Sequence, residues 1–329
     1  MTPQPQRLGG LPQRRRGLHY AASCMAKHGK LQTTLEYLPA RVILFVLGLL
    51  PASVAMSIGR LMGRLAYLLA ANLRRTAQRN LELAMLEKSQ AERDEIVKSC
   101  FLSLGRTLGI FSQFSTRSPG SLKKLFDIRG LEYLEHAKTE GNGVVLFTGH
   151  LGAWELSAFS LSLIGQPLSF LVRRIDNDMV ESLVDESRQR FGNKTLDKLS
   201  AARSMVKILR SGESLGLLLD LNTLDDEAIF VDFFGIPAST NFMVAKLALR
   251  TNSPIVPIFA PWNEEQQKYV VSLYPAIHPE VTGDEELDVR KLTTRLSHTI
   301  EEQIRQHPGQ WLWIHKRWKT RPPGEPGLY

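Results

Sequence analysis

The feature that most constrains this chain is an alternation of short apolar runs with amphipathic segments, which begins after Gly130. Such alternation is typical of an α/β fold with a mainly parallel central sheet flanked by helices. The predicted strands are 143–148, 168–173, 214–220, 229–234, 254–260 and 268–274. The predicted helices between or after them are 152–164, 177–191, 197–211, 241–251 and 286–306.

The N-terminal part has a different character. Residues 1–35 contain several Arg and Lys and no acidic residue, so we expect a flexible basic leader. No charge occurs from Val42 to Gly59, and residues 36–70 are expected to form a membrane-associated hydrophobic helical element. A single span, two helices separated by Pro51 and a pair of core helices all remain open for this element. Residues 71–329 form the expected main domain, in which Ser89 and Glu92 have the spacing of a helix-capping box.

Composition narrows the class of protein further. A chain of 329 residues of which 43% are hydrophobic can bury a large core. Two cysteines cannot form a disulfide framework, which agrees with a reducing compartment. The net charge of +8 indicates an anionic partner. Nucleic acid is disfavoured because the aromatic residues lie in apolar runs and do not alternate with basic ones.

The strongest candidate for chemistry is His150, which directly follows the predicted strand 143–148. Glu155 lies five positions on, in the first turn of the predicted helix. Catalytic groups in open α/β sheets gather at the carboxyl ends of strands. A histidine there can take and return a proton near neutral pH, and a carboxylate can orient it. No Ser or Cys nucleophile adjoins the pair, which favours a base that acts on a substrate hydroxyl. A structural His–Glu pair is the alternative.

Other polar residues end predicted strands or lie in conspicuous runs. Arg173 and Arg174 end the second strand, where they fit phosphate binding. The alternative is a helix-capping cluster with Asp176 or Asn177 as the cap, and Asn177 can cap while Arg173 binds. Asp220 follows an apolar run and is either a site carboxylate or a cap. The Phe233-Phe234 loop fits an apolar tunnel or the core, and residues 311–321 mix aromatic side chains with cations. Spacing supplies no further ligands beside His150, so we expect no catalytic metal.

In this order the motifs resemble those of the lipid A late acyltransferases, within the wider H-x4-D/E glycerolipid acyltransferase group. The resemblance runs from about Glu36 to the C-terminus. It rests on His150 to Glu155, Arg173 with Asp176-Asn177, Phe233-Phe234-Gly235 with Ala238 and Thr240, and the closing Trp311-Leu312-Trp313-x-His315-x-Arg317-Trp318-Lys319-Thr320-Arg321-Pro322.

The resemblance implies transfer of a fatty acyl group from an acyl carrier protein thioester to a hydroxyl of an anionic glycolipid, without a cofactor. It implies the inner membrane as location, with the catalytic domain on the cytoplasmic face. His150 is the expected base, Glu155 its orienting carboxylate, and amides near Gly152 or Arg173 the expected oxyanion donors. The expected substrate-binding residues are Arg173, Asn177, Asp220, Thr240, Arg317 and Arg321. The expected lining of the acyl chain or cleft is Trp154, Phe233 and Phe234.

The chain departs from the family pattern near the expected acceptor side, at Asp220-Leu221-Asn222, Asp232 and Arg174. These departures bear on the identity of the acceptor more than on the reaction. Two alternatives stay open: an acyl-CoA-dependent transferase for a lysophospholipid or another glycolipid, and a catalytically inactive membrane lipid-binding protein.

Overall fold

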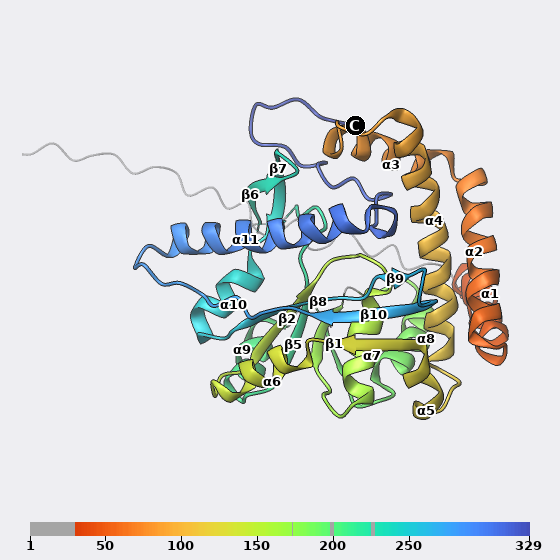
Figure 1. Ribbon diagram of the computed structural model, residues 1–329, viewed down its shortest axis with the longest axis horizontal. Helices are drawn as coiled ribbons and strands as arrows, with labels where there is room; N and C mark the ends of the chain where they lie inside the picture. The colour runs from red at the N-terminus through yellow and green to blue at the C-terminus, as the bar shows by residue number, and fades with distance from the viewer. Residues whose placement is uncertain (1–29, 173, 198–200, 225–227) are drawn as a thin grey trace, which may run out of the picture.

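The computed structural model describes residues 30–172, 174–197, 201–224 and 228–329. Within these residues the chain forms a central sheet with helices on both faces and an upright layer of N-terminal helices at one end (Figure 1). The predicted leader lies outside the described residues up to residue 29. Residues 30–35, which we had included in the leader, are the start of a helix.

The central sheet is mainly parallel, as predicted, and has eight strands among the described residues. Its order is β1-β10-β8-β2-β5-β3-β4, and β9 pairs with β10. β10 is parallel to β1 and antiparallel to β8 and β9, so β1 and β10 run opposite to the other strands of this sheet. The strands are β1 (Phe126–Arg129), β2 (Val144–Thr148), β3 (Ser169–Val172), β4 (Lys194–Asp197), β5 (Ser214–Leu218), β8 (Ile255–Phe259), β9 (Trp262–Asn263) and β10 (Lys268–Leu273).

The predicted strand 229–234 forms, but outside this sheet. It is β6 (Ala228–Phe233), which pairs only with β7 (Ile236–Asn241) in an antiparallel hairpin. Phe234 and Gly235 connect them, both with positive φ (57° and 76°). Two such residues make a tight hairpin turn, so the chain folds back on itself instead of crossing over to the parallel sheet.

Helices cover the two faces of the sheet because successive strand residues point to opposite sides. Val145 and Phe147 of β2 pack into one core cluster, and Val144 and Leu146 pack into another. On the Val144 face lie α6 (Leu131–Thr139), α7 (Trp154–Leu163) and α8 (Asp178–Gln189). On the Val145 face lie α9 (Ala201–Arg210), α10 (Met243–Thr251) and α11 (Glu285–Gln306).

The N-terminal layer consists of α1 (Lys30–Leu49), α2 (Ala52–Leu69), α3 (Ala71–Ala84) and α4 (Gln90–Gln113). Pro51 lies between α1 and α2, so the uncharged run forms two helices, as one of our alternatives expected. The predicted capping box is confirmed, because Ser89 and Glu92 hold each other's backbone N–H groups at the start of α4. The short helices are α5 (Pro119–Leu122), η1 (Lys123–Leu125) and η3 (Pro308–Gln310).

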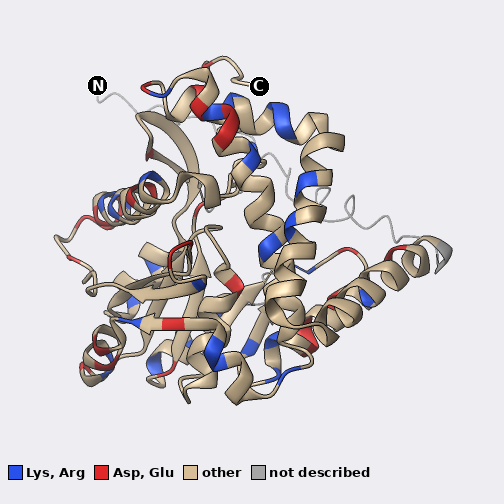
Figure 2. Ribbon diagram, turned by 45° about the vertical axis from the view of Figure 1, so that its right-hand side comes forward, with Lys and Arg blue, Asp and Glu red and all other residues tan. Residues whose placement is uncertain are grey.

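Among the described residues no single helix is long and apolar enough to cross a bilayer. The single span expected as one alternative for Val42–Gly59 does not form, because the helix breaks before Pro51. By length and composition only the bent pair of α2 and α3, which meet at 88°, is a candidate. α1 and α2 nevertheless expose large apolar side chains, and basic residues recur along α2 and α3 (Figure 2).

α2 and α4 approach so closely that their contact requires glycine. A Cβ added to Gly105 would lie 2.0 Å from the carbonyl oxygen of Gly59. One added to Gly63 would lie 2.2 Å from the carbonyl oxygen of Phe101. Glycine thus occurs at i and i+4 on both helices, at Gly59 and Gly63 and at Gly105 and Gly109, which is the small-residue pattern of close helix pairs.

Candidate active site

His150 and Asp220 are brought together by two neighbouring strands. β2 and β5 are parallel, with Thr148 opposite Leu218. His150 and Asp220 each follow two residues after this pair, so both lie at the carboxyl edge of the sheet. A Cβ at Gly149 would lie only 2.9 Å from Asp220 Oδ2, so the absence of a side chain there permits the close approach.

The Asp220 carboxylate is buried and fully engaged. Its Oδ1 lies 2.8 Å from His150 Nδ1, and its Oδ2 accepts the His150 backbone N–H at 2.6 Å and the Trp311 Nε1–H at 2.7 Å. Burial raises the pKa of Asp220, but the contacts with His150 and Trp311 outweigh it and hold the pKa below its usual value. An ionised carboxylate can only accept, so Nδ1 carries the proton and Nε2 is the nitrogen left to take one.

Glu155 has a different partner from the one we predicted. Both of its oxygens accept hydrogen bonds from Arg188 of α8, at 2.6 Å and 3.2 Å. Burial lowers the pKa of Arg188, but Glu155 and nearby carboxylates outweigh it, so the net shift is upward. The expected role of Glu155 in orienting His150 is therefore corrected, because the structure gives that contact to Asp220.

The C-terminal segment forms part of the site's framework. Leu151 and Trp311 form an isolated antiparallel bridge, and Leu312 N–H donates to the carbonyl of His150 at 3.1 Å. Trp311 is also the indole that binds Asp220. One strand-like segment therefore fixes the backbone of the base and the position of its carboxylate.

His315, four residues after Trp311, supports the loop that follows Asp220. Its Nε2 accepts the N–H of Asn222, two residues after Asp220, at 3.0 Å. Burial lowers the pKa of His315 to about 4. The neutral ring can accept this bond near neutral pH, which keeps the Asp220 loop in place.

Two amides near Gly152 are not free to serve as the expected oxyanion donors. Gly152 N–H donates to the carbonyl of Gln310 at 2.9 Å, and Ala153 N–H donates to the carbonyl of Ala260 at 3.0 Å. The Gly152 and Ala153 N–H groups thus close the backbone around the site, and an oxyanion role for the N–H groups at the start of α7 stays a prediction. Arg173, the other expected donor, lies outside the described residues.

Two pockets meet at His150. The first, which we call the α7 pocket, has a volume of about 290 Å³ and runs between α7 and the sheet. Beyond His150, Trp154, Glu155 and Arg188, its lining includes apolar residues such as Leu146, Leu161, Leu168, Phe170 and Ile258. The second, the α9 pocket, has a volume of about 380 Å³ and includes Ala202 and Met205 of α9 and Met243 and Val244 of α10.

Two predicted substrate-binding residues, Arg317 and Thr240, are buried, and a third, Arg321, is partly buried. Arg317 is 1% exposed and donates to the carbonyl of Ser239 at 2.7 Å and to Thr240 Oγ1 at 2.5 Å. Burial lowers the pKa of Arg317 to about 10. Arg321 donates to the carbonyl of Pro237 and pairs with Glu325. These expectations are corrected: Arg317, Thr240 and Arg321 attach the C-terminal segment to the β6–β7 hairpin and line neither pocket.

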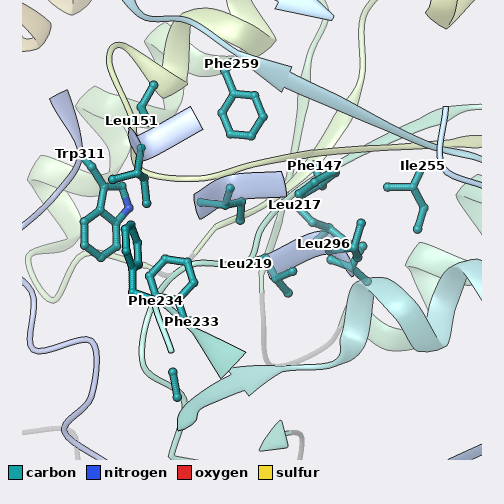
Figure 3. Packing of buried hydrophobic residues seen from close by; sticks show 14 of the residues in the cluster. Phe147, Leu151, Leu217, Leu219, Phe233, Phe234, Ile255, Phe259, Leu296 and Trp311 are labelled. Atoms are coloured by element: carbon teal, nitrogen blue, oxygen red, sulfur yellow. The ribbon is translucent and has the colours of Figure 1, made fainter. Parts of the chain in front are cut away.

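Phe233 and Phe234 also differ from the expectation. Both are buried, and Figure 3 shows them beside Trp311 in the apolar core. The ring centroids of Phe233 and Trp311 are 5.7 Å apart. Neither phenylalanine lines the two pockets, so their expected role as acyl-chain lining is corrected. Trp154 does line the α7 pocket, with its ring centroid 5.0 Å from that of His150.

Asn177 is 4% exposed and is a structural residue in this fold. Its Oδ1 caps α8 by accepting the N–H groups of Met179 and Val180. Its amide donates to the carbonyl of Thr33 and to Glu36, which ties α8 to α1. The capping role that we considered is confirmed, and substrate binding is corrected because the whole amide is engaged.

Among the described residues, one group has the spacing of metal ligands, namely Asp232, His298 and Glu301. It lies on the β6–β7 hairpin and α11, away from His150. Glu301 already accepts the N–H of Phe234 and pairs with Arg305. This group does not contribute to the site.

Sequence reasoning missed Arg188 and the function of Trp311 as an Asp220 donor. Arg188 had no signal, because a basic residue on an amphipathic helix is ordinary. The His150–Asp220 pair did have a sequence signal, because both residues follow apolar runs that are typical of parallel strands. The order of the strands, which only the fold supplies, is needed to use it.

Comparison with known proteins agrees with this geometry. Residues 27–320 match the family model "Bacterial lipid A biosynthesis acyltransferase". A lipid A biosynthesis acyltransferase of Haemophilus influenzae is 28% identical over 77% of each chain. Two Escherichia coli proteins follow: the lipid A biosynthesis myristoyltransferase is 25% identical over 80% of each chain, and the palmitoleoyltransferase is 27% identical over 85% of this chain and 90% of its own. With a candidate base at the junction of two pockets and a family match across most of its length, the chain belongs to the bacterial lipid A biosynthesis acyltransferases, which are O-acyltransferases.

Proposed function

We propose that this enzyme moves a fatty acyl group from the thioester of an acyl carrier protein to a hydroxyl of an anionic glycolipid of the lipid A precursor type. The observation that carries this proposal is His150, which lies between two pockets with its Nδ1 held by Asp220. A transferase of this kind must bring two substrates to one base. The family supports an acceptor related to lipid A.

The proposed chemistry uses His150 alone as the proton carrier. Nε2 takes the proton of the acceptor hydroxyl while the oxygen attacks the thioester carbonyl. The tetrahedral intermediate collapses, the carbon–sulfur bond breaks and the thiolate takes the proton from the imidazolium. Asp220 keeps Nδ1 protonated and stabilises the charged ring, in the manner of the third member of a triad.

The hydrocarbon chain that is transferred fits the α7 pocket best. Leu146, Leu161, Leu168 and Phe170 make its inner lining apolar, and His150 and Trp154 lie in its polar part. Burying a methylene group contributes about 0.8 kcal/mol, so such a pocket can hold a chain without polar contacts. This replaces Phe233 and Phe234 as the proposed acyl-chain lining.

Arg188 and Glu155 give the α7 pocket a charged border. Arg188 remains protonated at neutral pH and is 14% exposed in its side chain, beside a carboxylate that fixes its direction. We assign this pair to orienting the acyl carbonyl or its oxyanion. Glu155 thereby keeps a place in the site through Arg188 instead of through His150.

The proposed location is the cytoplasmic face of the inner membrane. Exposed apolar side chains on α1 and α2, among them Leu38, Phe45 and Leu65, support contact with a lipid surface. Arg60 and Arg64 of α2 and Arg74 of α3 support attraction to anionic head groups. A glycolipid acceptor would reach the site from that surface.

A turnover assay tests the proposal. The purified protein is supplied with an acyl carrier protein thioester and with lipid A precursor, and product is measured by mass spectrometry. We expect transfer by the natural chain and a loss of roughly 10²-fold or more in His150→Ala. Transfer from acyl-CoA at equal rate would favour the glycerolipid alternative. No transfer from either donor would favour the lipid-binding alternative.

A further inference from the structure

α9 carries a row of cations on one side and lines a pocket of the active site on the other. Arg203, Lys207 and Arg210 follow one another at i, i+4 and i+7, so they lie on one face of the helix. All three are exposed, and together with Val206 and Ser211 they line a shallow depression. Within the described residues none of the three has a carboxylate partner.

The other side of the same helix reaches the active site. Ala202 and Met205 line the α9 pocket, whose lining includes His150. Met205 and Leu209 are buried in the core, so the helix is firmly seated. The row from Arg203 to Arg210 spans about 10 Å along the helix, at ~1.5 Å per residue. The row therefore begins at Arg203, next to Ala202 of the α9 pocket, and runs towards the amino edge of the sheet, where the Leu209 carbonyl accepts the Gly143 N–H at 2.8 Å.

The position of α9 argues against a lipid surface as its occupant. α1 and α2, which expose the apolar side chains, lie at the opposite end of the long axis from α9 (Figure 1). A bilayer that covers α1 and α2 leaves α9 in the aqueous phase. No large apolar residue of α9 belongs to the exposed set, which a lipid-inserting helix would need.

We propose that Arg203, Lys207 and Arg210 form the docking surface for an acidic carrier protein, which passes its thioester arm through the α9 pocket to His150. This proposal rests on the proposed function. Complementary charge speeds the encounter of two proteins and sets their register. A row of three cations that begins next to the α9 pocket, without carboxylate partners among the described residues, suits a row of carboxylates on the carrier. The donor then enters on the α9 side, while the membrane-borne acceptor comes from the side of α1 and α2.

The test compares two double variants with the same change of charge. Arg203→Glu with Lys207→Glu reverses two cations at i and i+4 on α9. Lys291→Glu with Arg295→Glu does the same on α11, where both residues are exposed and line neither pocket of the site. Circular dichroism and thermal unfolding check the fold. If the α9 glutamates prevent folding, the Arg203→Gln with Lys207→Gln variant replaces them.

The measured quantity is kcat/KM for two donors, the acyl carrier protein thioester and acyl-pantetheine, which has the arm without the protein. We expect the α9 variant to lower the carrier-to-pantetheine ratio about tenfold or more, through KM for the carrier. The difference in kcat/KM for the carrier thioester between the natural chain and the α9 variant should become smaller as the ionic strength is raised. The α11 variant should keep the ratio of the natural chain.

Other results would overturn the docking proposal. One is a carrier-to-pantetheine ratio that does not change in the α9 variant, or a kcat/KM that falls equally for both donors. Another is an equal fall of the ratio in the α11 variant. The last is a loss of binding of the α9 variant to anionic phospholipid vesicles while its KM for the carrier stays unchanged. Failure of the natural chain to use the carrier thioester at all would instead overturn the proposed function. The two failures are thus distinguishable.

Discussion

Asp220 shows how one buried carboxylate can determine the chemistry of a histidine. Its two oxygens accept three hydrogen bonds, from His150 Nδ1, the His150 backbone and Trp311. No water-exposed face remains, since the Asp220 side chain is 0% exposed. The ring is held in one tautomer and one orientation, which is what a general base requires.

We expect Asp220→Asn to lower kcat roughly 10²-fold or more with little change in KM. The amide that replaces the carboxylate can present an N–H to Nδ1, which favours the tautomer with the proton on Nε2. Steady-state kinetics on purified protein measure this. Glu155→Gln is the matched carboxylate-to-amide control and should cost less, since it leaves the His150–Asp220 bond intact. A larger loss in Glu155→Gln would restore Glu155 as the orienting group.

His315 makes stability depend on pH. An unfolded histidine titrates near 6.5, whereas in the folded chain burial lowers the pKa of His315 to about 4. Between these values the unfolded state binds more protons, so the free energy of unfolding falls as pH drops from about 6.5 to about 4. The pKa of His307 is also lowered by burial, and it acts in the same direction.

Urea unfolding midpoints of the natural chain and of His315→Gln, measured between pH 4 and 7, test this. The Gln side-chain oxygen can still accept the Asn222 N–H, so the fold is kept. We expect the urea midpoint of the variant to change less with pH over this range than that of the natural chain. Parallel curves would show that His315 does not titrate as its burial implies.

At the scale of elements, α2 and α4 are joined by glycine contacts more than by large side chains. We expect Gly105→Ala to destabilise the protein by about 1–3 kcal/mol, because its Cβ would overlap the Gly59 carbonyl at 2.0 Å. Alanine has a higher helix propensity than glycine, so a loss of stability in this variant would point to the close helix contact. Gly120→Ala is the control, since its Cβ would meet nothing within 4 Å. Thermal unfolding measures both, and equal midpoints would contradict the tight contact.

The prediction of elements succeeded where neighbouring residues in the chain determine the structure. It failed where the structure depends on which strands pair with each other. Ser89 and Asn177 cap their helices through their own neighbours in the chain, so the sequence pattern was sufficient. The segment 229–234 is a strand by composition, but its partner depends on the positive φ values at Phe234 and Gly235. β4 was not among the predicted strands, because its four residues carry no clear periodicity, and it ends at residue 197, where we predicted the start of a helix.

At the scale of the whole molecule, the exposed apolar side chains of α1 and α2 predict that the protein binds to membranes. We expect binding to anionic phospholipid vesicles to persist in high salt, because burial of apolar side chains is insensitive to screening. Phe45→Glu with Leu49→Glu should release it. Val281→Glu with Leu287→Glu, which also changes two exposed apolar residues, should not. Vesicle sedimentation measures all three, and release of the natural chain by salt alone would contradict the prediction.

The sequence by itself determined the family, the α/β class, most strand and helix positions, and His150 as the candidate base. These follow from periodicity, capping and motif order, which are local properties of the chain. Only the tertiary structure decided that Asp220 holds His150, that Glu155 binds Arg188, and that Arg317 and Phe233 are buried. Each of these depends on which strands are neighbours and on which way a helix faces, and contacts between residues far apart in the chain leave no spacing in the sequence from which to read them.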